Sequence, residues 1–175
     1  VTHALNCGYR HIDTAAIYGN ESDVGAAIKQ SFVPRSEMFI TTKLWNGDQG
    51  YDSTFVAFEQ SLEALDLDYV DLYLMHFPVP QLRLESWAAM EELYQKGKVK
   101  AIGVSNFLPH HLEELIKQCR IVPMVNQIEA HPFQTQEATR AVCQQHNIVV
   151  SAYSPLVKAQ KMNHPVLIQV ARQHN

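Results

Sequence analysis

Residues 70–78 read VDLYLMHFP, an almost continuous apolar run that ends at His76. A run of this kind is typical of a strand whose two faces are both covered, as in parallel sheets. Helical patterns flank it, because residues 53–65 place apolar side chains at helical spacing and residues 86–95 read as a second helix. Ser53 is a good N-cap candidate for the first of these helices. The stretch therefore predicts a strand at residues 70–75 between two helices, the unit from which parallel sheets are built.

The same alternation of strand and helix runs through the whole chain. We expect five further strands, at residues 9–13, 38–44, 100–104, 123–129 and 148–153. We expect further helices at residues 22–31, 109–118, 135–146 and 165–174, and the end of a helix at residues 1–7, stopped by Gly8. No linker, low-complexity tract or short repeat divides this pattern. We therefore expect residues 1–175 to form a single domain around one parallel sheet.

Two architectures fit such a sheet. A doubly wound sheet usually carries a GxGxxG phosphate loop after its first strand, and the HIDTAAIYGNE segment at residues 11–21 does not match it. A (β/α)8 barrel instead collects its functional side chains at the carboxyl ends of its strands. This chain has polar side chains at every strand end: Asp13, Lys43, His76, Ser105 with Asn106, Gln127, and Tyr153. We predict a (β/α)8 TIM barrel, of which the chain supplies about six of the eight strands.

Four reactive side chains follow the first three strands: Asp13, Tyr18, Lys43 and His76. A tyrosine with a pKa near ~10 donates its proton more readily beside an ammonium that stabilises the phenolate. Tyr18 would then act as general acid, with Lys43 held by Asp13 and with His76 orienting a carbonyl oxygen. Each residue alone also fits a structural role, as a turn residue, a loop aromatic, a solvated strand end or a core histidine. Their joint occurrence favours the chemical interpretation.

A second group of side chains follows the later strands. Ser105, Asn106 and Gln127 can hydrogen-bond a carboxamide, and Tyr153 offers a flat face to a heteroaromatic ring. Ser154 comes next and could meet a phosphate. Capping of turns and core packing are the alternative roles for these residues. Two aromatic residues near the reactive set, Trp45 and Phe77, could wall an apolar substrate pocket, although they also fit the core.

The composition argues against several other classes of protein. The chain is 46% hydrophobic and 18% charged, with a net charge of −4, so it has no basic footprint for nucleic acid. We expect no membrane span and no secretory leader, and the natural start to lie upstream of Val1. Three cysteines without a CxxC pair indicate a reducing compartment, so we expect a cytoplasmic protein. The nine histidines are scattered or adjacent, and we predict no metal site.

At these motifs the chain resembles the aldo-keto reductases, and in particular the compact bacterial members similar to 2,5-diketo-gluconate reductase. The resemblance covers nearly all 175 residues. The segments that carry it are GYRHIDTAAIYGNE, TTKLW, SLEALDLDYVDLYLMHFP, KVKAIGVSNF, VNQIEAHP and AYSPL. The resemblance implies a (β/α)8 oxidoreductase that uses NADPH, without excluding NADH, to reduce a small carbonyl substrate by hydride transfer.

The resemblance also implies a role for each matching position. Asp13, Tyr18, Lys43 and His76 match the catalytic set, with Tyr18 as proton donor. The implied cofactor ligands are Ser105, Asn106 and Gln127 for the nicotinamide carboxamide, Tyr153 for ring stacking, and Ser154 with Leu156 for the pyrophosphate. The cofactor supplies the redox chemistry, and the protein orients it.

The chain departs from the family pattern in several places. Phe77 stands where aldose reductases commonly have Trp, and Lys158 stands where some members have Ser. The family's opening strand, its final strand and its segment for the 2′-phosphate of NADPH are not in these 175 residues. We expect the parent to be a monomer and this chain to self-associate through open sheet edges. Two alternatives remain: a non-catalytic cofactor-binding module and an inactive fragment.

Overall fold

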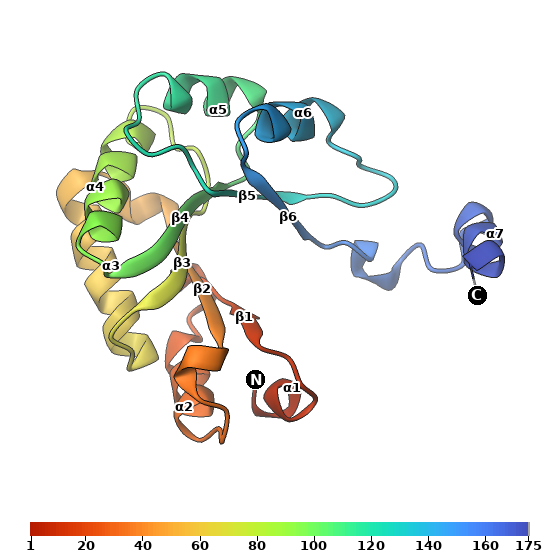
Figure 1. Ribbon diagram of the computed structural model, residues 1–175, viewed down its shortest axis with the longest axis horizontal. Coiled ribbons are helices and arrows are strands. Elements are labelled where there is room, and N and C mark those ends of the chain that lie inside the picture. The colour runs from red at the N-terminus through yellow and green to blue at the C-terminus, as the bar shows by residue number, and fades with distance from the viewer. Residues whose placement is uncertain (175) are drawn as a thin grey trace.

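The computed structural model describes residues 1–174 and contains one six-stranded parallel sheet. Its strands are β1 (His11–Asp13), β2 (Phe39–Leu44), β3 (Val70–Met75), β4 (Val99–Ser105), β5 (Val125–Glu129) and β6 (Val149–Tyr153). They hydrogen-bond in chain order from β1 to β6. A doubly wound sheet reverses its strand order once. The unbroken order therefore matches the wall of a barrel, and Figure 1 shows the sheet curving as such a wall.

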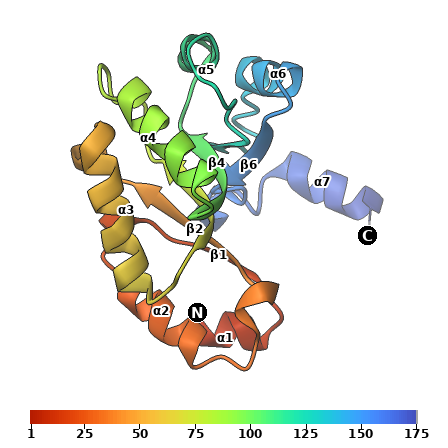
Figure 2. The ribbon, with the colours of Figure 1, turned by 60° about the vertical axis from the view of Figure 1, so that its left-hand side comes forward.

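The chain contains seven α-helices among residues 1–174, most of which cover the outer side of this curved sheet (Figure 1). They are α1 (Thr2–Asn6), α2 (Glu21–Lys29), α3 (Tyr51–Leu65), α4 (Arg83–Gln95), α5 (Pro109–Ile116), α6 (Glu137–Gln145) and α7 (Pro165–His174). Figures 1 and 2 show α2 to α6 around the outside of the sheet, with α7 standing apart from it. Among residues 1–174, no helix has the length and apolar character needed to cross a membrane.

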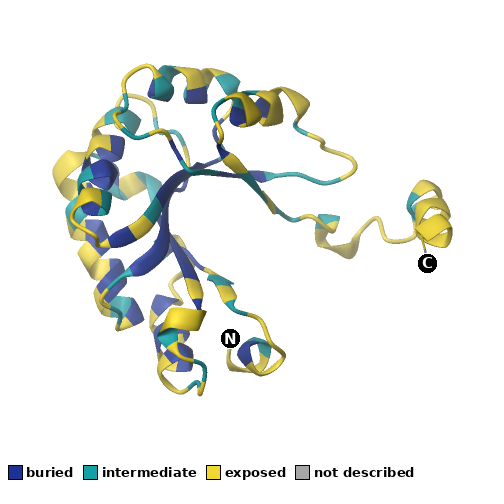
Figure 3. Ribbon diagram, in the orientation of Figure 1, coloured by how far each residue is buried: buried dark blue, intermediate teal, exposed yellow. Residues whose placement is uncertain are grey.

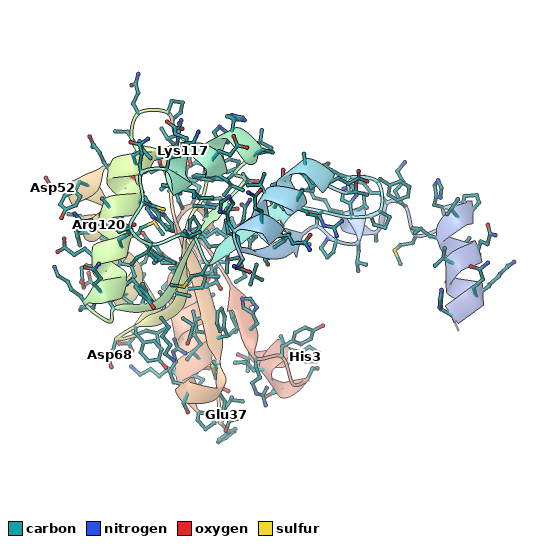
Figure 4. The ribbon with its side chains drawn as sticks, turned by 45° about the horizontal axis from the view of Figure 1, so that its top comes forward. His3, Glu37, Asp52, Asp68, Lys117 and Arg120 are labelled. Carbon is teal, nitrogen blue, oxygen red and sulfur yellow. The ribbon has the colours of Figure 1, made fainter. Side chains whose placement is uncertain are left out.

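The core lies between the sheet and the helices. Strand side chains alternate between the two faces, so Tyr73 points outward from β3 and meets Phe58 of α3 at a ring-centroid distance of 4.9 Å. Trp87 and Met90 of α4 are buried in the same cluster. Figure 3 shows the inward faces of the helices as buried and their outer faces as exposed. The charged side chains labelled in Figure 4, such as Asp52 and Lys117, lie on the periphery.

The concave side of the sheet is less covered toward its edges. Phe39 shares the concave face with Lys43, and Val149 shares it with Tyr153, because alternate residues lie on one face. Val149 is 63% exposed and Phe39 is 40% exposed. Within residues 1–174, β1 and β6 each pair with one neighbour. The expected self-association through such open edges stays a prediction.

Element boundaries agree with those expected from the sequence to within three residues. The strand at residues 70–75 is confirmed, whereas α4 begins at Arg83 rather than at residue 86. The prediction that Ser53 caps α3 is wrong. The helix begins at Tyr51, because Gly50 takes the N-cap position with a φ of 129° and donates its N–H to Ser86 Oγ at 2.8 Å. A side chain from α4 thus decides where α3 starts.

Gly25 allows α2 and α3 to approach closely. A methyl group added at Gly25 would lie 2.3 Å from the carbonyl oxygen of Leu65. We expect Gly25→Ala to lower the free energy of unfolding by about 2 kcal/mol, since an overpacking cost of about 3 kcal/mol exceeds a helix-propensity gain of about 1 kcal/mol. Urea unfolding measures this change. Gly47→Ala is the matched control, because its methyl group would meet only Trp45 Cδ1, at 3.8 Å. Equal stability of the two variants would contradict the prediction.

Candidate active site

An ion pair between a buried lysine and a partly exposed aspartate links the ends of β1 and β2. Lys43 is 1% exposed, and its ammonium donates hydrogen bonds to Asp13 Oδ1 and, at 2.7 Å, to the backbone oxygen of Thr14. The Asp13 side chain is 34% exposed and also accepts a hydrogen bond from Gln127 Nε2 at 2.7 Å. A buried ammonium requires a partner and further hydrogen bonds. Asp13 supplies the charge, and the Thr14 carbonyl supplies the second acceptor.

Tyr18 and His76 lie beside this pair. Tyr18 ends the short 3-10 helix η1 (Ala16–Tyr18) in the β1–α2 loop and is 53% exposed. Its ring meets the His76 ring edge-on, with centroids 5.9 Å apart, and Lys43 Nζ lies 5.2 Å from the Tyr18 ring centroid. The structure therefore brings together all four side chains that the sequence placed after the first three strands.

His76 is a buried, uncharged histidine at neutral pH. Burial is the main cause that lowers its pKa to about 4, and the nearby Lys43 ammonium adds to the effect while Asp13 opposes it. Its Nδ1 atom is buried without a hydrogen-bond partner among the described residues. A neutral imidazole keeps one donor and one acceptor nitrogen. His76 can therefore orient a carbonyl oxygen without placing a second cation beside Lys43.

The low pKa of His76 predicts a specific pH dependence of stability. The unfolded chain takes up a proton at His76 near its ordinary pKa of 6.5, whereas the folded chain does so only near pH 4. Neutral His76 thus stabilises the fold fully above about pH 6.5, and this contribution is lost as the pH falls toward 4. An NMR titration of the His76 ring should give a midpoint near pH 4. A midpoint near 6.5 would contradict this assignment.

The later strands contribute an internally bonded polar cluster. Asn106 has a φ of 63°, and its Nδ2 donates to the His76 backbone oxygen at 2.9 Å and to Ser105 Oγ at 3.1 Å. Its Oδ1 accepts the Tyr153 hydroxyl at 2.9 Å. The Ser105 hydroxyl in turn donates to the Gln127 backbone oxygen at 2.8 Å. The cluster connects the ends of β3, β4, β5 and β6.

Within this cluster of described residues, only Gln127 keeps polar groups that could hydrogen-bond a carboxamide. Both N–H groups of Asn106 and the hydroxyl of Ser105 are used within the chain. Gln127 donates one N–H to Asp13 and, among the described hydrogen bonds, keeps its other N–H and its Oε1. An N–H donor and a carbonyl acceptor complement the two polar groups of a carboxamide. Burial and the nearby Glu129 raise the pKa of Tyr153, so its phenol is neutral at pH 7.

An aromatic wall stands behind His76. The Trp45 ring meets the His76 ring edge-on at 5.4 Å and the Phe77 ring at 6.4 Å, and Phe77 stacks on His76 at 5.2 Å. Gln49 holds Phe77 in place, because its Nε2–H group donates a hydrogen bond to the Phe77 backbone oxygen at 2.7 Å. The two residues expected to wall an apolar pocket are therefore in contact with the candidate site.

These groups surround a cleft of about 760 Å³ on the concave side of the sheet. Of the residues expected from the sequence, those that line it are Asp13, Tyr18, His76, Phe77, Ser105, Asn106, Gln127, Tyr153 and Ser154. Lys43, Trp45 and Leu156 are not among the lining residues, and Leu156 is 65% exposed. A second hollow, of about 800 Å³ over α3, contains none of these residues.

Comparison with known proteins decides the family. The model of the Aldo/keto reductase family matches residues 1–160.

The chain belongs to the aldo/keto reductase family.

A curated family member, the glyoxal reductase of Bacillus subtilis (strain 168), is 54% identical over 175 residues, which cover 100% of this chain and 63% of that protein. The crystal structure of an aldo/keto reductase from Brucella melitensis is 50% identical and superposes with a TM-score of 0.94, covering 99% of this chain and 67% of the other. A silkworm aldo-keto reductase complexed with NADPH is 34% identical, with a TM-score of 0.93 and coverages of 99% and 60%.

The comparison with solved aldo/keto reductases confirms the predicted fold class. The six parallel strands match part of an aldo/keto reductase barrel. The chain spans about 63% of the length of the curated relatives it matches. Four cleft-lining residues of this family member were missed from its sequence: Tyr9, His11, Ser151 and Ala152. His11 and Ser151 lie two positions before Asp13 and Tyr153, so the two-residue period of a strand could have revealed them.

Proposed function

We propose that this chain carries the active site of an NADPH-dependent reductase that converts aldehydes and ketones to alcohols. One observation carries the proposal: the Tyr18 phenol stands beside the buried Lys43–Asp13 pair and edge-on to His76. This is a proton donor with a cation beside it to stabilise its conjugate base. Membership of the aldo/keto reductase family supports the same reaction class.

Four side chains, Asp13, Tyr18, Lys43 and His76, have separate roles in the proposed proton transfer. When bound, the nicotinamide would supply a hydride to the carbonyl carbon. Tyr18 gives its hydroxyl proton to the carbonyl oxygen, and Lys43 stabilises the phenolate that remains. Asp13 holds Lys43 charged and in place, and His76 orients the carbonyl oxygen through a neutral nitrogen. Because Tyr18 is half-exposed, water can return its proton.

Six residues would hold the cofactor. Gln127, Ser105 and Asn106 are proposed for the carboxamide: among the described residues Gln127 has a free N–H and Oε1, whereas the donors of Ser105 and Asn106 would have to exchange partners within the cluster to reach it. Tyr153 would contact the nicotinamide ring, and Ser154 with Leu156 would contact the pyrophosphate. The free N–H and carbonyl oxygen of Gln127 support the first of these assignments, and the NADPH complex of a silkworm relative supports the choice of NADPH over NADH. Leu156 is 65% exposed, and its backbone oxygen accepts the N–H of Ala159 at 2.8 Å.

The substrate is proposed to be a small carbonyl compound. The aromatic wall of Trp45 and Phe77 would cover its apolar part. A relative named glyoxal reductase supports small aldehydes. We also propose a cytoplasmic location, because Cys7, Cys119 and Cys143 are all unpaired.

Nucleotide binding by the 175-residue chain tests the cofactor site. We expect NADPH fluorescence to change on titration with the chain, and Gln127→Leu to weaken binding by about tenfold through the loss of two hydrogen bonds of about 0.5–1.5 kcal/mol each. Gln144→Leu, at an exposed position on α6, is the matched control. Equal NADPH affinity in the two variants would contradict the role of Gln127. NADPH binding without aldehyde turnover would instead indicate a non-catalytic module or a chain that needs the rest of its parent protein.

A further inference from the structure

Tyr18 depends on its loop for its position. Among residues 1–174, the Tyr18 hydroxyl forms no hydrogen bond, and the ring lies edge-on to His76 with Lys43 Nζ 5.2 Å from its centroid. The phenol is carried by residues 14–20, which connect β1 to α2. Because the Tyr18 side chain is half-exposed and has no hydrogen bond, its position is set by the conformation of the backbone that carries it.

Thr14 fixes the first end of the loop. It is 1% exposed, its N–H donates to the Thr41 backbone oxygen at 2.9 Å, and its own backbone oxygen accepts from Lys43 Nζ at 2.7 Å. Its hydroxyl donates to Asn20 Oδ1 at 2.7 Å. Thr14 thus joins the loop both to β2 and to the buried lysine of the site.

Asn20 fixes the other end in an unusual way. It occupies the N-cap position of α2, where an Asn side chain ordinarily accepts an N–H from the first helical turn. Here the side chain makes no such bond, and its oxygen accepts the Thr14 hydroxyl instead. The hydrogen bond therefore closes the loop across the residues that carry Tyr18, at the expense of a helix cap.

The residues around this closure reinforce it. Gly19 has a φ of 64°, the left-handed conformation that turns the chain back from Tyr18 toward α2. Glu21 is buried, and its carboxylate accepts the hydroxyls of Thr42, at 2.5 Å, and Ser61, at 3.3 Å. The helix end that follows Asn20 is thereby attached to β2 and α3, so closing the loop onto Asn20 places Tyr18 relative to the sheet.

We propose that Thr14 and Asn20 are positioning residues for Tyr18: their side-chain hydrogen bond holds the loop so that the phenol lies edge-on to His76 and beside Lys43. The inference rests on the proposed function only for the role of the phenol. The position of the ring is a separate observable, which is measured without cofactor or turnover.

The experiment measures the NMR cross-relaxation peak between the Tyr18 and His76 ring protons in the 175-residue chain. Thr14→Val removes the hydroxyl at nearly constant shape, and Asn20→Leu removes the acceptor at an exposed position. Asn20→Asp keeps an acceptor oxygen and serves as the conservative rescue. Thr139→Val is the matched control, because Thr139 is a buried threonine on α6 whose hydroxyl faces Gln136 Oε1 at 3.5 Å.

We expect the Tyr18–His76 peak to be lost in Thr14→Val and Asn20→Leu and kept in Asn20→Asp and Thr139→Val. Where turnover is measured, kcat should fall by up to about 10²-fold with KM unchanged, the effect of a misplacement of about 1 Å. An unchanged peak in Thr14→Val or Asn20→Leu, or its loss in Asn20→Asp, would overturn the inference. If Thr14→Val does not fold, Asn20→Leu decides alone. Absence of turnover in the unmodified chain would count against the proposed function and leave this result standing.

Discussion

Replacing Tyr18 by Phe is expected to lower the rate of aldehyde reduction by about 10²–10⁴-fold, the usual contribution of a general acid. The variant keeps the ring that lies near His76 and Lys43 Nζ and loses only the hydroxyl. NADPH affinity should therefore stay within about twofold of the unmodified chain, because the residues proposed to hold the cofactor are unchanged. NADPH consumption with a small aldehyde measures the rate, and fluorescence titration measures the affinity.

Tyr94→Phe is the control for this experiment, because it removes a tyrosine hydroxyl from the outer helix α4. Its rate should equal that of the unmodified chain. Equal rates in Tyr18→Phe and Tyr94→Phe would remove Tyr18 from the mechanism. If neither the variants nor the unmodified chain turn over while NADPH still binds, the chain is a binding module or needs the rest of its parent protein.

Asp13→Asn should lower the free energy of unfolding by about 3 kcal/mol, the low end for breaking a buried ion pair. Lys43 is 1% exposed, so a neutral amide at position 13 leaves its ammonium buried without a counter-charge, with the amide oxygen and the Thr14 carbonyl as its acceptors. Lys43→Met should lower the free energy of unfolding by less than Asp13→Asn does. The Asp13 carboxylate is 34% exposed and keeps the hydrogen bond from Gln127. Urea unfolding at pH 7 measures both changes.

The double variant Asp13→Asn with Lys43→Met provides the internal control. Removing the lysine from the Asp13→Asn background should restore stability, with a coupling energy of about 1–3 kcal/mol between the two positions. Additive losses in the double variant would show that the two side chains act independently. Such a result would contradict the buried ion pair as the link between β1 and β2.

Much of the fold could be predicted from local pattern. The strand at residues 70–75 was predicted to the residue, because a nearly continuous apolar run between two helical patterns has few other solutions. The barrel was predicted because polar side chains end each strand. The start of α3 could not be predicted in this way. Ser53 is a good cap residue, but the hydroxyl of Ser86, 36 residues from Gly50, sets the N-cap at Gly50.

The candidate site divides along the same line. The sequence by itself determined which reactive side chains follow the strands and, through its motifs, the family. Only the tertiary structure decided which side chains hydrogen-bond to one another. Gln127 donates to Asp13 across 114 residues, and Tyr153 donates to Asn106 across 47. The Asn20 side chain accepts from Thr14 instead of capping α2. The physical reason is that strand and helix patterns depend on near neighbours, whereas a hydrogen bond between elements depends on strand register and loop geometry. Those are set by packing of the whole sheet.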